Sequence, residues 1–269
     1  MRKIKKVLPK RTANSNPKTP AAPKNSWLII GSGRLATHLK FFLPQLVGKK
    51  HSLKPTFSVR IHQWTRSESL EKLDTTLKQV DRILLAIPDS AIQKFLSTIY
   101  DRNPEIFNAK TWVHFSGCLS LTGVRSAHPL MSFGPRLYKV ENYKKIHWTC
   151  EKPWSLEDCL PGVQASWSSI SSEEKSLYHS ACVMMGNLPL YWWTEAEKIF
   201  SEMKIPQQGW ELYLNQVFEN WHQMGARAFT GPLARGDHQT LISHLLSLQG
   251  RPVQKALAGV YESFIGKEK

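Results

Sequence analysis

The feature that most constrains the fold is a short stretch at residues 26–39, which reads SWLIIGSGRLATHL. Its four consecutive apolar residues, WLII, predict a buried strand, and the pattern from Arg34 onward predicts a helix. The turn between them has the spacing GxGxxA, with Gly31, Gly33 and Ala36 at the small positions. In such a turn the first glycine permits a sharp bend, the second lets the backbone approach a pyrophosphate, and the third small residue allows close helix packing. The helix start would offer free N–H groups to phosphate; a tight turn without a ligand is the alternative.

Strand-like and helix-like segments alternate after this turn as far as residue 152. Further strands are predicted at 58–64, 82–88, 111–117, 124–130 and 144–151, and helices at 34–42, 70–78 and 90–100. The third strand, RILLAIP, is almost wholly apolar, as expected for a parallel strand covered on both faces. This rhythm is typical of α/β proteins and predicts a doubly wound parallel sheet of the Rossmann type, which binds ligands at the carboxyl edge of its strands.

The pattern changes after about residue 168, where only helical periodicity remains. A capping box at Ser171 and Glu174 precedes one helical stretch. Pro206 precedes another, whose apolar residues recur at intervals of three and four. We therefore predict an α/β fold in three parts: an unfolded basic tail at 1–25, a dinucleotide-binding Rossmann domain at 26–165, and an all-α C-terminal domain at 166–269.

The positive charge of the chain is concentrated at its start. The formal net charge is +15, and residues 1–25 hold eight Lys or Arg and no acid, which leaves about +7 for the rest. A tail of this composition cannot bury enough apolar surface to fold. A solvated leader is the favoured interpretation, and binding to an anionic surface is the alternative. Because the excess charge lies in the tail, nucleic-acid binding is the weakest functional hypothesis. No apolar run reaches the roughly 18 residues of a membrane span.

The four cysteines stand apart from one another, as Cys118, Cys150, Cys159 and Cys182, with no CxxC spacing. This arrangement argues against a zinc site or a disulfide framework and favours a reducing compartment. The histidines show no HExxH spacing either. We therefore expect a cytoplasmic protein that holds no metal.

The end of the second predicted strand indicates which dinucleotide would bind. NAD-binding proteins place an Asp or Glu there to accept from the ribose 2′-OH, whereas this chain has Thr65, Arg66 and Ser67, with no acid before Glu68. An arginine between two hydroxyls suits a 2′-phosphate. NADP(H) is therefore favoured over NAD(H), and an ordinary surface charge is the alternative for Arg66.

The third predicted strand ends in a small apolar loop at the same edge of the sheet. Asp89 or Ser90 is expected to cap the helix that follows, and this structural role is the one favoured for Asp89. The spacing from the glycine turn to Thr65 exceeds the usual ~20 residues, which implies an insertion at 42–56. The residues predicted to contact the cofactor are Gly31, Ser32, Gly33, Arg34, Leu35, Ala36, Thr65, Arg66, Ser67, Ala86, Ile87 and Pro88.

Six segments occur in the order found in Rossmann-like proteins with a DUF2520 domain: GSGRLATHL, AIPDSAI, VHFSGCLS, AHPLMSF, YHSACVMMGN and FTGPLARGD. The chain resembles this family from about Trp27 to Phe264. The family is similar to the superfamily with 6-phosphogluconate-dehydrogenase-like C-terminal domains, which includes ketopantoate, pyrroline-carboxylate and β-hydroxyacid enzymes and prephenate dehydrogenases. The resemblance implies a cofactor in the first domain, a substrate cleft between the domains and, by analogy, a homodimer. Some members resemble ketopantoate reductases, which transfer hydride from NADPH to a 2-oxo acid.

The resemblance also suggests residues for the chemistry. Prephenate dehydrogenases carry a functional Ser and a His in an HP motif, and Ser116 and His128 match them by type. His128 could polarise or protonate the substrate oxygen, since imidazole titrates near neutrality; packing beside Pro129 is the alternative. His114 lies within a predicted strand and is expected to be structural.

A second set of candidates lies in the helical half. Ketopantoate reductases place a catalytic lysine one helical turn before an asparagine, and Asn187 matches the asparagine, but Val183 stands where the lysine is expected. His179, two turns before Asn187, is the candidate substitute. In the segment TGPLARGD, Arg235 is predicted to hold the substrate carboxylate, unless it pairs with Asp237 and only rigidifies the turn. Asp237 is also placed to cap the following helix.

These patterns lead to one main hypothesis and two alternatives. The main hypothesis is an NADP(H)-dependent oxidoreductase acting on a small carboxylate, with reduction of a 2-oxo acid such as 2-dehydropantoate as the first candidate reaction. Oxidation of the prephenate type is favoured by the HP motif but lacks its usual arginines. A non-catalytic NADP-binding regulatory protein is supported by the missing lysine.

Overall fold

The computed structural model describes residues 25–47 and 58–265 and divides the chain into two compact units, residues 1–183 and 184–269. We call them the sheet unit and the helical unit. The predicted tail, except Asn25, lies outside the described residues, as does most of the predicted insertion. In the described part of the chain, no helix is both long enough and apolar enough to cross a membrane.

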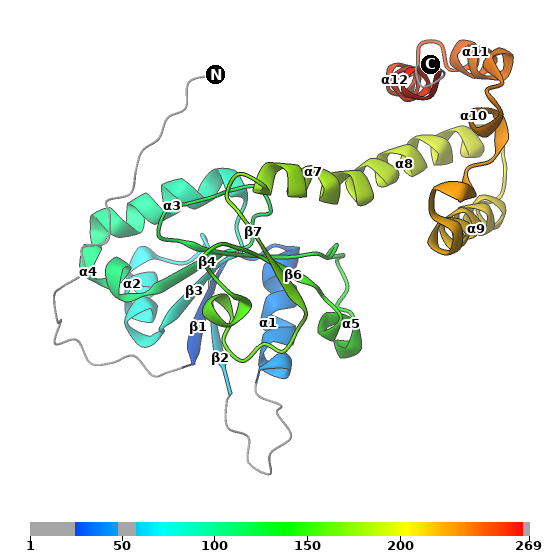
Figure 1. Ribbon diagram of the computed structural model, residues 1–269. Coiled ribbons are helices and arrows are strands. Elements are labelled where there is room, and N and C mark those ends of the chain that lie inside the picture. The colour runs from blue at the N-terminus through cyan, green and yellow to red at the C-terminus, as the bar shows by residue number, and fades with distance from the viewer. Residues whose placement is uncertain (1–24, 48–57, 266–269) are drawn as a thin grey trace. The chain divides into compact units, whose positions relative to one another are not determined.

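A seven-stranded sheet forms the centre of the sheet unit (Figure 1). Its strands are β1 (Ser26–Ile30), β2 (Arg60–Trp64), β3 (Arg82–Leu85), β4 (Thr111–His114), β5 (Arg125–Pro129), β6 (Trp148–Glu151) and β7 (Trp167–Ile170). They lie in the order β2-β1-β3-β4-β5-β6-β7. The first five are parallel, β6 runs antiparallel to β5, and β7 is parallel to β6. The predicted Rossmann architecture is confirmed, with the correction that the sheet is not parallel throughout.

Helices cover both faces of this sheet (Figure 1). They are α1 (Arg34–Leu46), α2 (Leu70–Gln79), α3 (Asp89–Arg102), α4 (Pro104–Ala109), α5 (Val140–Lys144), α6 (Leu156–Cys159) and the start of α7 (Lys175–Met185). Because side chains alternate along a strand, Trp27 and Ile29 of β1 enter the core under α1, whereas Leu28 and Ile30 enter the core under α2 and α3. Burying each such side chain contributes roughly 1.5–3 kcal/mol, so the strand is held from both sides.

The first helix runs beyond its predicted end at residue 42. It continues to Leu46 with Pro44 inside it. Leu43 and Leu46 are buried against the sheet, and this burial offsets the hydrogen bond that the proline cannot make. The first part of the predicted insertion is therefore helical.

The sheet also extends beyond the predicted domain boundary at residue 165. β7 pairs with β6, with Trp167 opposite Trp148, so the prediction of an all-helical region from residue 166 is wrong for residues 167–170. The strand reads WSSI, is short, and exposes its first three residues. It therefore lacks the alternation of buried apolar residues that would have revealed it. The two units divide between Val183 and Met184, inside α7.

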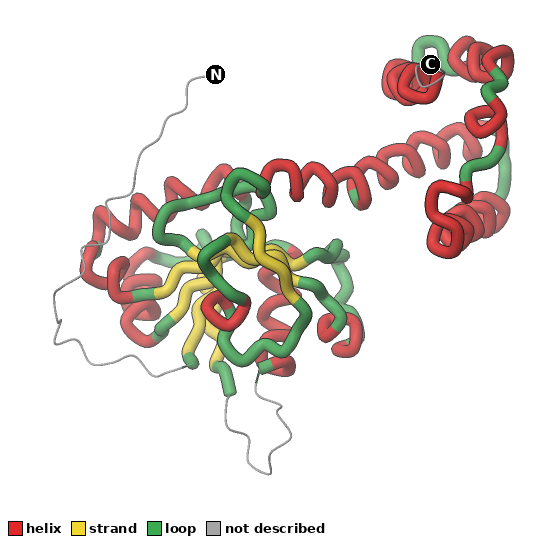
Figure 2. The backbone as a smooth tube through the Cα atoms, viewed as in Figure 1, coloured by secondary structure: helices red, strands yellow, loops and turns green. Residues whose placement is uncertain are grey.

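The described residues of the helical unit form only helices and connecting loops (Figure 2). The helices are α8 (Asn187–Glu202), α9 (Gln207–Met224), the 3-10 turn η1 (Gly225–Ala228), α10 (Gly231–Arg235), α11 (His238–Ser247) and α12 (Val253–Ile265). α11 and α12 pack together, and His244 Nδ1 lies 2.9 Å from Tyr261 Oη. Among the described residues of this unit, only Leu241, Val253 and Tyr261 are buried. The helical unit therefore has a very small core of its own.

Candidate functional site

The glycine turn lies at the carboxyl end of β1, beside the loop that follows β3. Gly31 has a φ of +127°, a conformation that side chains disfavour, and a Cβ there would overlap the carbonyl oxygen of Ala86. Its N–H donates to the carbonyl of Trp64 at 2.9 Å. The fold itself therefore requires a glycine at position 31.

Gly33 stands in a different environment. Its φ of −72° suits any residue, and a Cβ there would meet no atom within 4 Å. It is the N-cap residue of α1, with no side-chain cap bond and no acidic residue in the first turn. No contact within the protein explains a glycine here. An anion bound against the free N–H groups of α1 would explain it, because it needs the space that a side chain would fill. The turn therefore fits a pyrophosphate.

The other residues predicted at this turn differ in exposure. Ser32, Arg34 and Pro88 are exposed, and Leu35, Ala86 and Ile87 are half-buried. Ala36 is completely buried. Its side chain serves the close packing of α1 on the sheet and has no surface with which to contact a ligand.

The loop after β2 carries Arg66, which has no acidic partner among the described residues, and Glu68, whose carboxylate is already hydrogen-bonded within the loop. Arg66 is exposed and forms no ion pair with any residue in the described ranges. Thr65 Oγ1 and Ser67 Oγ lie 2.7 Å apart. Glu68 accepts from Lys72 Nζ and from the Thr65 N–H, which together hold the pKa of this carboxyl below its usual value. The first acid after β2 is thus engaged within its own loop.

Ser116 follows β4 and contacts the start of α3. Its Oγ donates to Asp89 Oδ2 at 2.6 Å and accepts from the N–H groups of Cys118 and Leu119 at 3.2 and 2.9 Å. A hydroxyl has one proton and two lone pairs, so the hydrogen-bonding capacity of Ser116 is fully used and it holds its own loop. The expectation that Asp89 caps α3 is wrong, because Pro88 is the N-cap residue and Asp89 binds Ser116 instead.

His128 and His179 come together over the loop that carries Ser116. His128 lies near the end of β5, and its Nδ1 is 2.7 Å from Tyr178 Oη on α7. The rings of His128 and His179 are 6.1 Å apart and nearly perpendicular. A Cβ on Gly117 would lie 2.7 Å from His179 Cδ2 and 3.2 Å from His128 Cδ2. The two imidazoles therefore leave no room for a side chain at position 117.

Burial sets the protonation of this group. Burial, followed by repulsion from His179 and Lys175, lowers the pKa of His128 to about 4. Burial also raises the pKa of Tyr178 to about 12. The expectation that His128 titrates near neutrality is wrong, and at pH 7 the imidazole is neutral and the phenol keeps its proton.

A buried lysine lies beneath this group. Lys175 is 2% exposed, and its Nζ donates to Ser126 Oγ at 2.5 Å and to the Ser116 carbonyl at 3.3 Å. It also pairs with Glu151 at 3.3 Å, and burial lowers its pKa. The resemblance to ketopantoate reductases predicts a lysine at the position of Val183, and so it does not identify Lys175. The only sequence signal is a cation in the first turn of a helix, which opposes the helix dipole.

His114 occupies the interior behind Ser116, as expected for a structural residue. It is fully buried, and its Nδ1 accepts from the Ser116 N–H at 3.2 Å. Its Nε2 has no hydrogen-bond partner among the described residues. Burial, with Lys175 nearby, lowers its pKa to about 3, so the imidazole stays neutral.

Two predicted site residues, Asn187 and Arg235, belong to the helical unit, and both are exposed. Asn187 is the first residue of α8, and Arg235 is the last residue of α10. Asp237 caps α11 as predicted, because its Oδ1 accepts from the Thr240 N–H at 3.1 Å. Arg235 makes no ion pair with Asp237 within the described residues.

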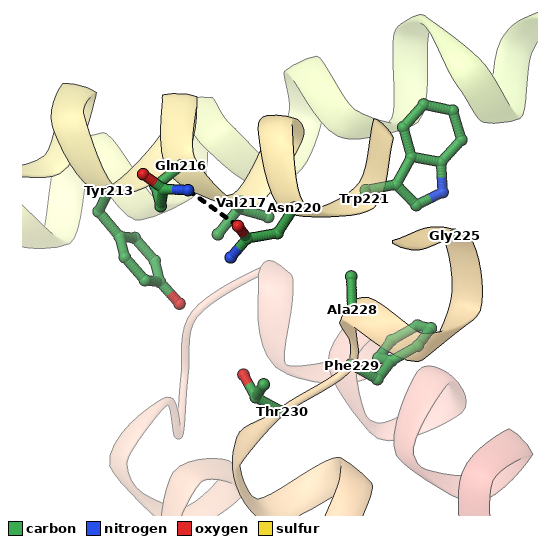
Figure 3. A pocket seen from close by; sticks show the side chains of 9 residues that line it. All are labelled: Tyr213, Gln216, Val217, Asn220, Trp221, Gly225, Ala228, Phe229 and Thr230. Carbon is green, nitrogen blue, oxygen red and sulfur yellow. Dashed lines mark hydrogen bonds between the residues drawn. The ribbon is translucent and has the colours of Figure 1, made fainter. Parts of the chain in front are cut away.

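A pocket of about 380 Å³ lies in the helical unit and contains none of the predicted site residues (Figure 3). It is walled by α9, η1 and the segment that follows, with Gln216 Nε2 donating to Asn220 Oδ1 at 2.8 Å. Its apolar walls are large hydrophobic side chains that are themselves exposed, namely Tyr213, Val217, Trp221 and Phe229. It is therefore part of a broad apolar surface and not an enclosed ligand site.

Comparison with known protein families finds a match to part of this chain. Residues 155–266 match the domain of unknown function DUF2520. The DUF2520 match begins at the capped helix α6, includes β7 and α7, and covers the helical unit as far as α12. It therefore contains His179, Asn187 and Arg235, but not the glycine turn. No curated protein sequence matches the chain.

Solved structures share the fold over almost the whole length. A Bacteroides fragilis protein proposed as an NADP oxidoreductase matches 90% of this chain and 98% of its own, at a TM-score of 0.68 and 20% identity. Protein TM1727 of Thermotoga maritima matches 90% of this chain and 99% of its own, at a TM-score of 0.55 and 19% identity. The third structure is a semialdehyde dehydrogenase NAD-binding protein of Cupriavidus necator in complex with calcium and NAD. It matches 90% of this chain and 99% of its own, at a TM-score of 0.52 and 14% identity. At these identities the likeness establishes the fold.

Proposed function

We propose that this protein is an NADP(H)-dependent oxidoreductase that acts on a small carboxylate, with reduction of 2-dehydropantoate as the first candidate reaction. The observation that carries the proposal is Gly33, a glycine that no neighbouring atom and no backbone angle requires, at the uncapped start of α1. The oxidoreductase description of the B. fragilis protein supports it. When bound, the nicotinamide ring supplies or accepts a hydride.

The residues of the glycine turn would hold the cofactor through its phosphates. N–H groups at the start of α1 would donate to the pyrophosphate, and the dipole of that helix favours its negative charge. Arg66 would pair with the 2′-phosphate, helped by the hydroxyls of Thr65 and Ser67. The similar structures name both NADP and NAD, so the preference for NADP(H) rests on Arg66 and on the engagement of Glu68.

Replacing Arg66 tests this preference. Arg66→Ala should weaken NADPH binding by about 1.5–3 kcal/mol, the range for hydrogen bonds to charged groups, and leave NADH binding nearly unchanged. Both affinities can be measured by isothermal titration calorimetry. The matched control is Arg60→Ala, because Arg60 is also exposed and is the first residue of β2, at the end of the strand away from Arg66. This variant should alter neither affinity. Equal losses for NADPH and NADH in Arg66→Ala would show that this residue does not bind the 2′-phosphate.

For the substrate, we propose that neutral His128 donates from Nε2 to the reacting oxygen and that His179 lies beside the same group. Ser116 would act on the substrate only through its loop, because its hydroxyl is already saturated. Asn187 and Arg235 remain candidates for substrate binding, with Arg235 as the carboxylate ligand, since both side chains are exposed and Arg235 has no acidic partner in the described ranges.

Two other functions are tested by the same assay. NADPH oxidation would be followed with a panel of 2-oxo acids, and NADP⁺ reduction with prephenate and 2-hydroxy acids. Turnover of 2-dehydropantoate supports the leading proposal, and turnover of prephenate alone supports the oxidative alternative. NADPH binding at micromolar concentration with no turnover of any compound would support a non-catalytic regulatory protein.

We also propose that the protein is a homodimer joined through the helical unit. No residue of α8 or α9 is buried, and large apolar side chains such as Leu212 (70% exposed) and Phe218 (59%) face outward. A unit with so little core needs further burial to be stable. A second copy of the chain carries the same apolar faces and is present at the same concentration, so a two-fold arrangement can cover both.

The cysteines support a location in the cytoplasm, which we also propose. All four are free thiols, and Cys150 and Cys159 are buried. Scattered unpaired thiols are typical of proteins that remain in a reducing compartment. Fractionation of cells that express the tagged protein tests this location.

A further inference from the structure

We propose that Tyr178 is the proton source for the reduction, acting through His128 as a relay to the substrate oxygen. The proposal rests on the proposed function, in which neutral His128 donates to the reacting oxygen. His128 then needs a source for the proton that it gives up, and the expected lysine is absent at Val183. His128 would be the catalytic residue, because it contacts the substrate oxygen. Tyr178 would be a positioning residue that orients the imidazole and replaces the proton that it gives up.

The geometry provides a short and well-anchored contact. Tyr178 Oη lies 2.7 Å from His128 Nδ1, and the two rings are nearly perpendicular at 5.5 Å. Tyr178 stands one turn after Lys175 on α7, and the buried pair of Lys175 with Glu151 fixes that turn to β6. The phenol is therefore held in place by the sheet unit itself.

The direction of this hydrogen bond follows from the protonation of the two groups. Burial keeps Tyr178 protonated by raising its pKa to about 12, and it keeps His128 neutral by lowering its pKa to about 4. A neutral imidazole has one donor and one acceptor nitrogen, so the phenol O–H donates to Nδ1 and the imidazole proton is carried on Nε2. Nε2 makes no hydrogen bond to any described residue and lies 3.3 Å from the position of a Cβ on Gly117. The donor atom thus remains available.

The titratable and charged groups near this pair are few. His179 and Lys175 disfavour a positive charge on His128, and Asp89 favours one weakly. The hydroxyl of Thr149 faces Tyr178 and lowers its pKa, whereas the thiol of Cys182 raises it. Burial and the nearby ammonium group of Lys175 favour a relay in which His128 never becomes an imidazolium.

The relay balances as follows. A hydride from the proposed cofactor NADPH bonds to the carbonyl carbon, and the C=O π pair moves to the oxygen. Nε2–H gives its proton to that oxygen, while Nδ1 takes the proton of Tyr178, so the imidazole stays neutral throughout. The products are the alcohol, NADP⁺, a Tyr178 phenolate, which Thr149 can stabilise by a hydrogen bond, and a His128 protonated on Nδ1. Once the alcohol leaves, water gives a proton to Nε2 and Nδ1–H returns its proton to the phenolate, which restores both residues.

The first test compares two tyrosines that make the same bond. Tyr178→Phe should lower kcat for 2-dehydropantoate about 100-fold, within the range for general acid–base catalysis, and leave KM within about threefold. Tyr143→Phe is the matched control, because Tyr143 Oη lies 2.6 Å from His38 Nδ1 in a buried pair elsewhere in the sheet unit. It should keep wild-type kcat. The double variant Tyr178→Phe/His128→Asn should lose no more than His128→Asn alone, since the two residues act as one unit.

The second test needs no turnover. Nitrogen-15 NMR of the histidine side chains should show His128 protonated on Nε2 in the free wild-type protein, and a mixture of tautomers in Tyr178→Phe. A proton on Nδ1 in the wild type, or an unchanged tautomer in the variant, overturns the relay. Equal kcat values for Tyr178→Phe and wild type overturn it as well. Absence of turnover and of NADPH binding in the wild type would instead count against the proposed function.

Discussion

At the scale of residues, two glycines that lie two positions apart in one turn are glycines for different reasons. Gly31 is required by its positive φ and by the carbonyl of Ala86. Gly33 meets neither condition and faces open space at the start of α1. The fold therefore requires the glycine at position 31, and a bound ligand would require the one at position 33. Substitutions at the two positions should have opposite effects on stability and on cofactor binding.

Gly33→Asp should leave the fold intact and abolish cofactor binding. Aspartate is a preferred N-cap residue, so the free energy of unfolding should stay equal or rise by a few tenths of a kcal/mol, while the carboxylate occupies and repels the pyrophosphate position. Gly31→Ala should instead unfold the protein at a lower temperature, because the new Cβ has no space. Thermal unfolding and NADPH titration of both variants check this. Full NADPH affinity in Gly33→Asp would remove the proposed site.

Two buried histidines make stability depend on pH below neutrality. The folded-state pKa values of His114 and His128, about 3 and about 4, lie below the ordinary value of 6.5. Above pH 6.5 both states are neutral and stability is fully present; as pH falls toward 4, the unfolded chain takes up protons that the folded chain does not. Stability should then fall by about 1.4 kcal/mol per pH unit for each histidine. Urea unfolding at pH 7.5, 6.5 and 5.5 measures it.

The control for this pH dependence is His114→Asn, which removes one of the two groups. Its stability at pH 7.5 should be lower than that of the wild type, because a buried side chain is replaced, but its slope between pH 6.5 and 5.5 should be about half. A wild-type stability that is flat over this range would contradict the protonation states on which the relay depends.

Residues that act through sequence-local patterns could be predicted, and those that act through tertiary contacts could not. The glycine turn is recognisable because a strand, a turn and a helix follow one another in the chain. Asp89 binds Ser116 across 27 positions, and Tyr178 binds His128 across 50, so no spacing rule reveals either pair. Ser116 matches a functional serine by type, but its three hydrogen bonds to Asp89, Cys118 and Leu119 depend on the folded loop and cannot be predicted from the sequence.

At the scale of elements, α7 is tied to the sheet by an ion pair inside the protein. Lys175 is 2% exposed and Glu151 9% exposed, so neither charge is well solvated. Each charge also has a hydrogen bond to a serine hydroxyl: Lys175 donates to Ser126, and Glu151 accepts from Ser120. Such a pair adds little net stability but is costly to break from one side, and it sets the position of the turn that carries Tyr178.

Lys175→Met should destabilise the protein by about 3–5 kcal/mol, because it leaves Glu151 buried without a partner. Adding Glu151→Leu should restore most of the loss. Arg102→Met breaks the exposed pair with Asp74 in the same unit and should cost less than about 1 kcal/mol. Chemical unfolding of the four proteins gives these values. A loss below 1 kcal/mol in Lys175→Met would show that the pair does not anchor α7.

The elements themselves were predictable wherever burial imposes a period. Strands β1 and β3 carry nearly continuous apolar runs because both of their faces are covered. β7 was missed because its exposed WSSI has no such run. The antiparallel direction of β6 was also missed, since direction depends on which neighbour a strand pairs with and not on its own composition.

At the scale of the whole molecule, the two units differ in how their apolar surface is covered. The sheet unit has two extended cores, one on each face of the sheet. The helical unit exposes Leu212, Tyr213 and Phe218 by more than half. Sequence periodicity correctly predicts a helix with an apolar stripe at α9, and no residue of α9 is buried within one chain.

Association through this surface should be measurable directly. Sedimentation of the full chain should give twice its mass of 30.8 kDa, and the thermal midpoint should rise with protein concentration. Phe218→Glu should yield a monomer with a lower midpoint, whereas Lys255→Glu, an exposed polar position on α12, should remain a dimer. A stable wild-type monomer at tens of micromolar would contradict the homodimer.

The order of the units along the chain has a consequence for biosynthesis. During translation the sheet unit can finish folding before α8 leaves the ribosome, because its cores need no later residue. The helices that follow have almost nothing of their own to fold onto. Each new molecule would thus pass through a stage in which the sheet unit is folded and the apolar side chains of the helical unit are still exposed. If the proposed dimer forms, the concentration of finished chains decides how long that stage lasts.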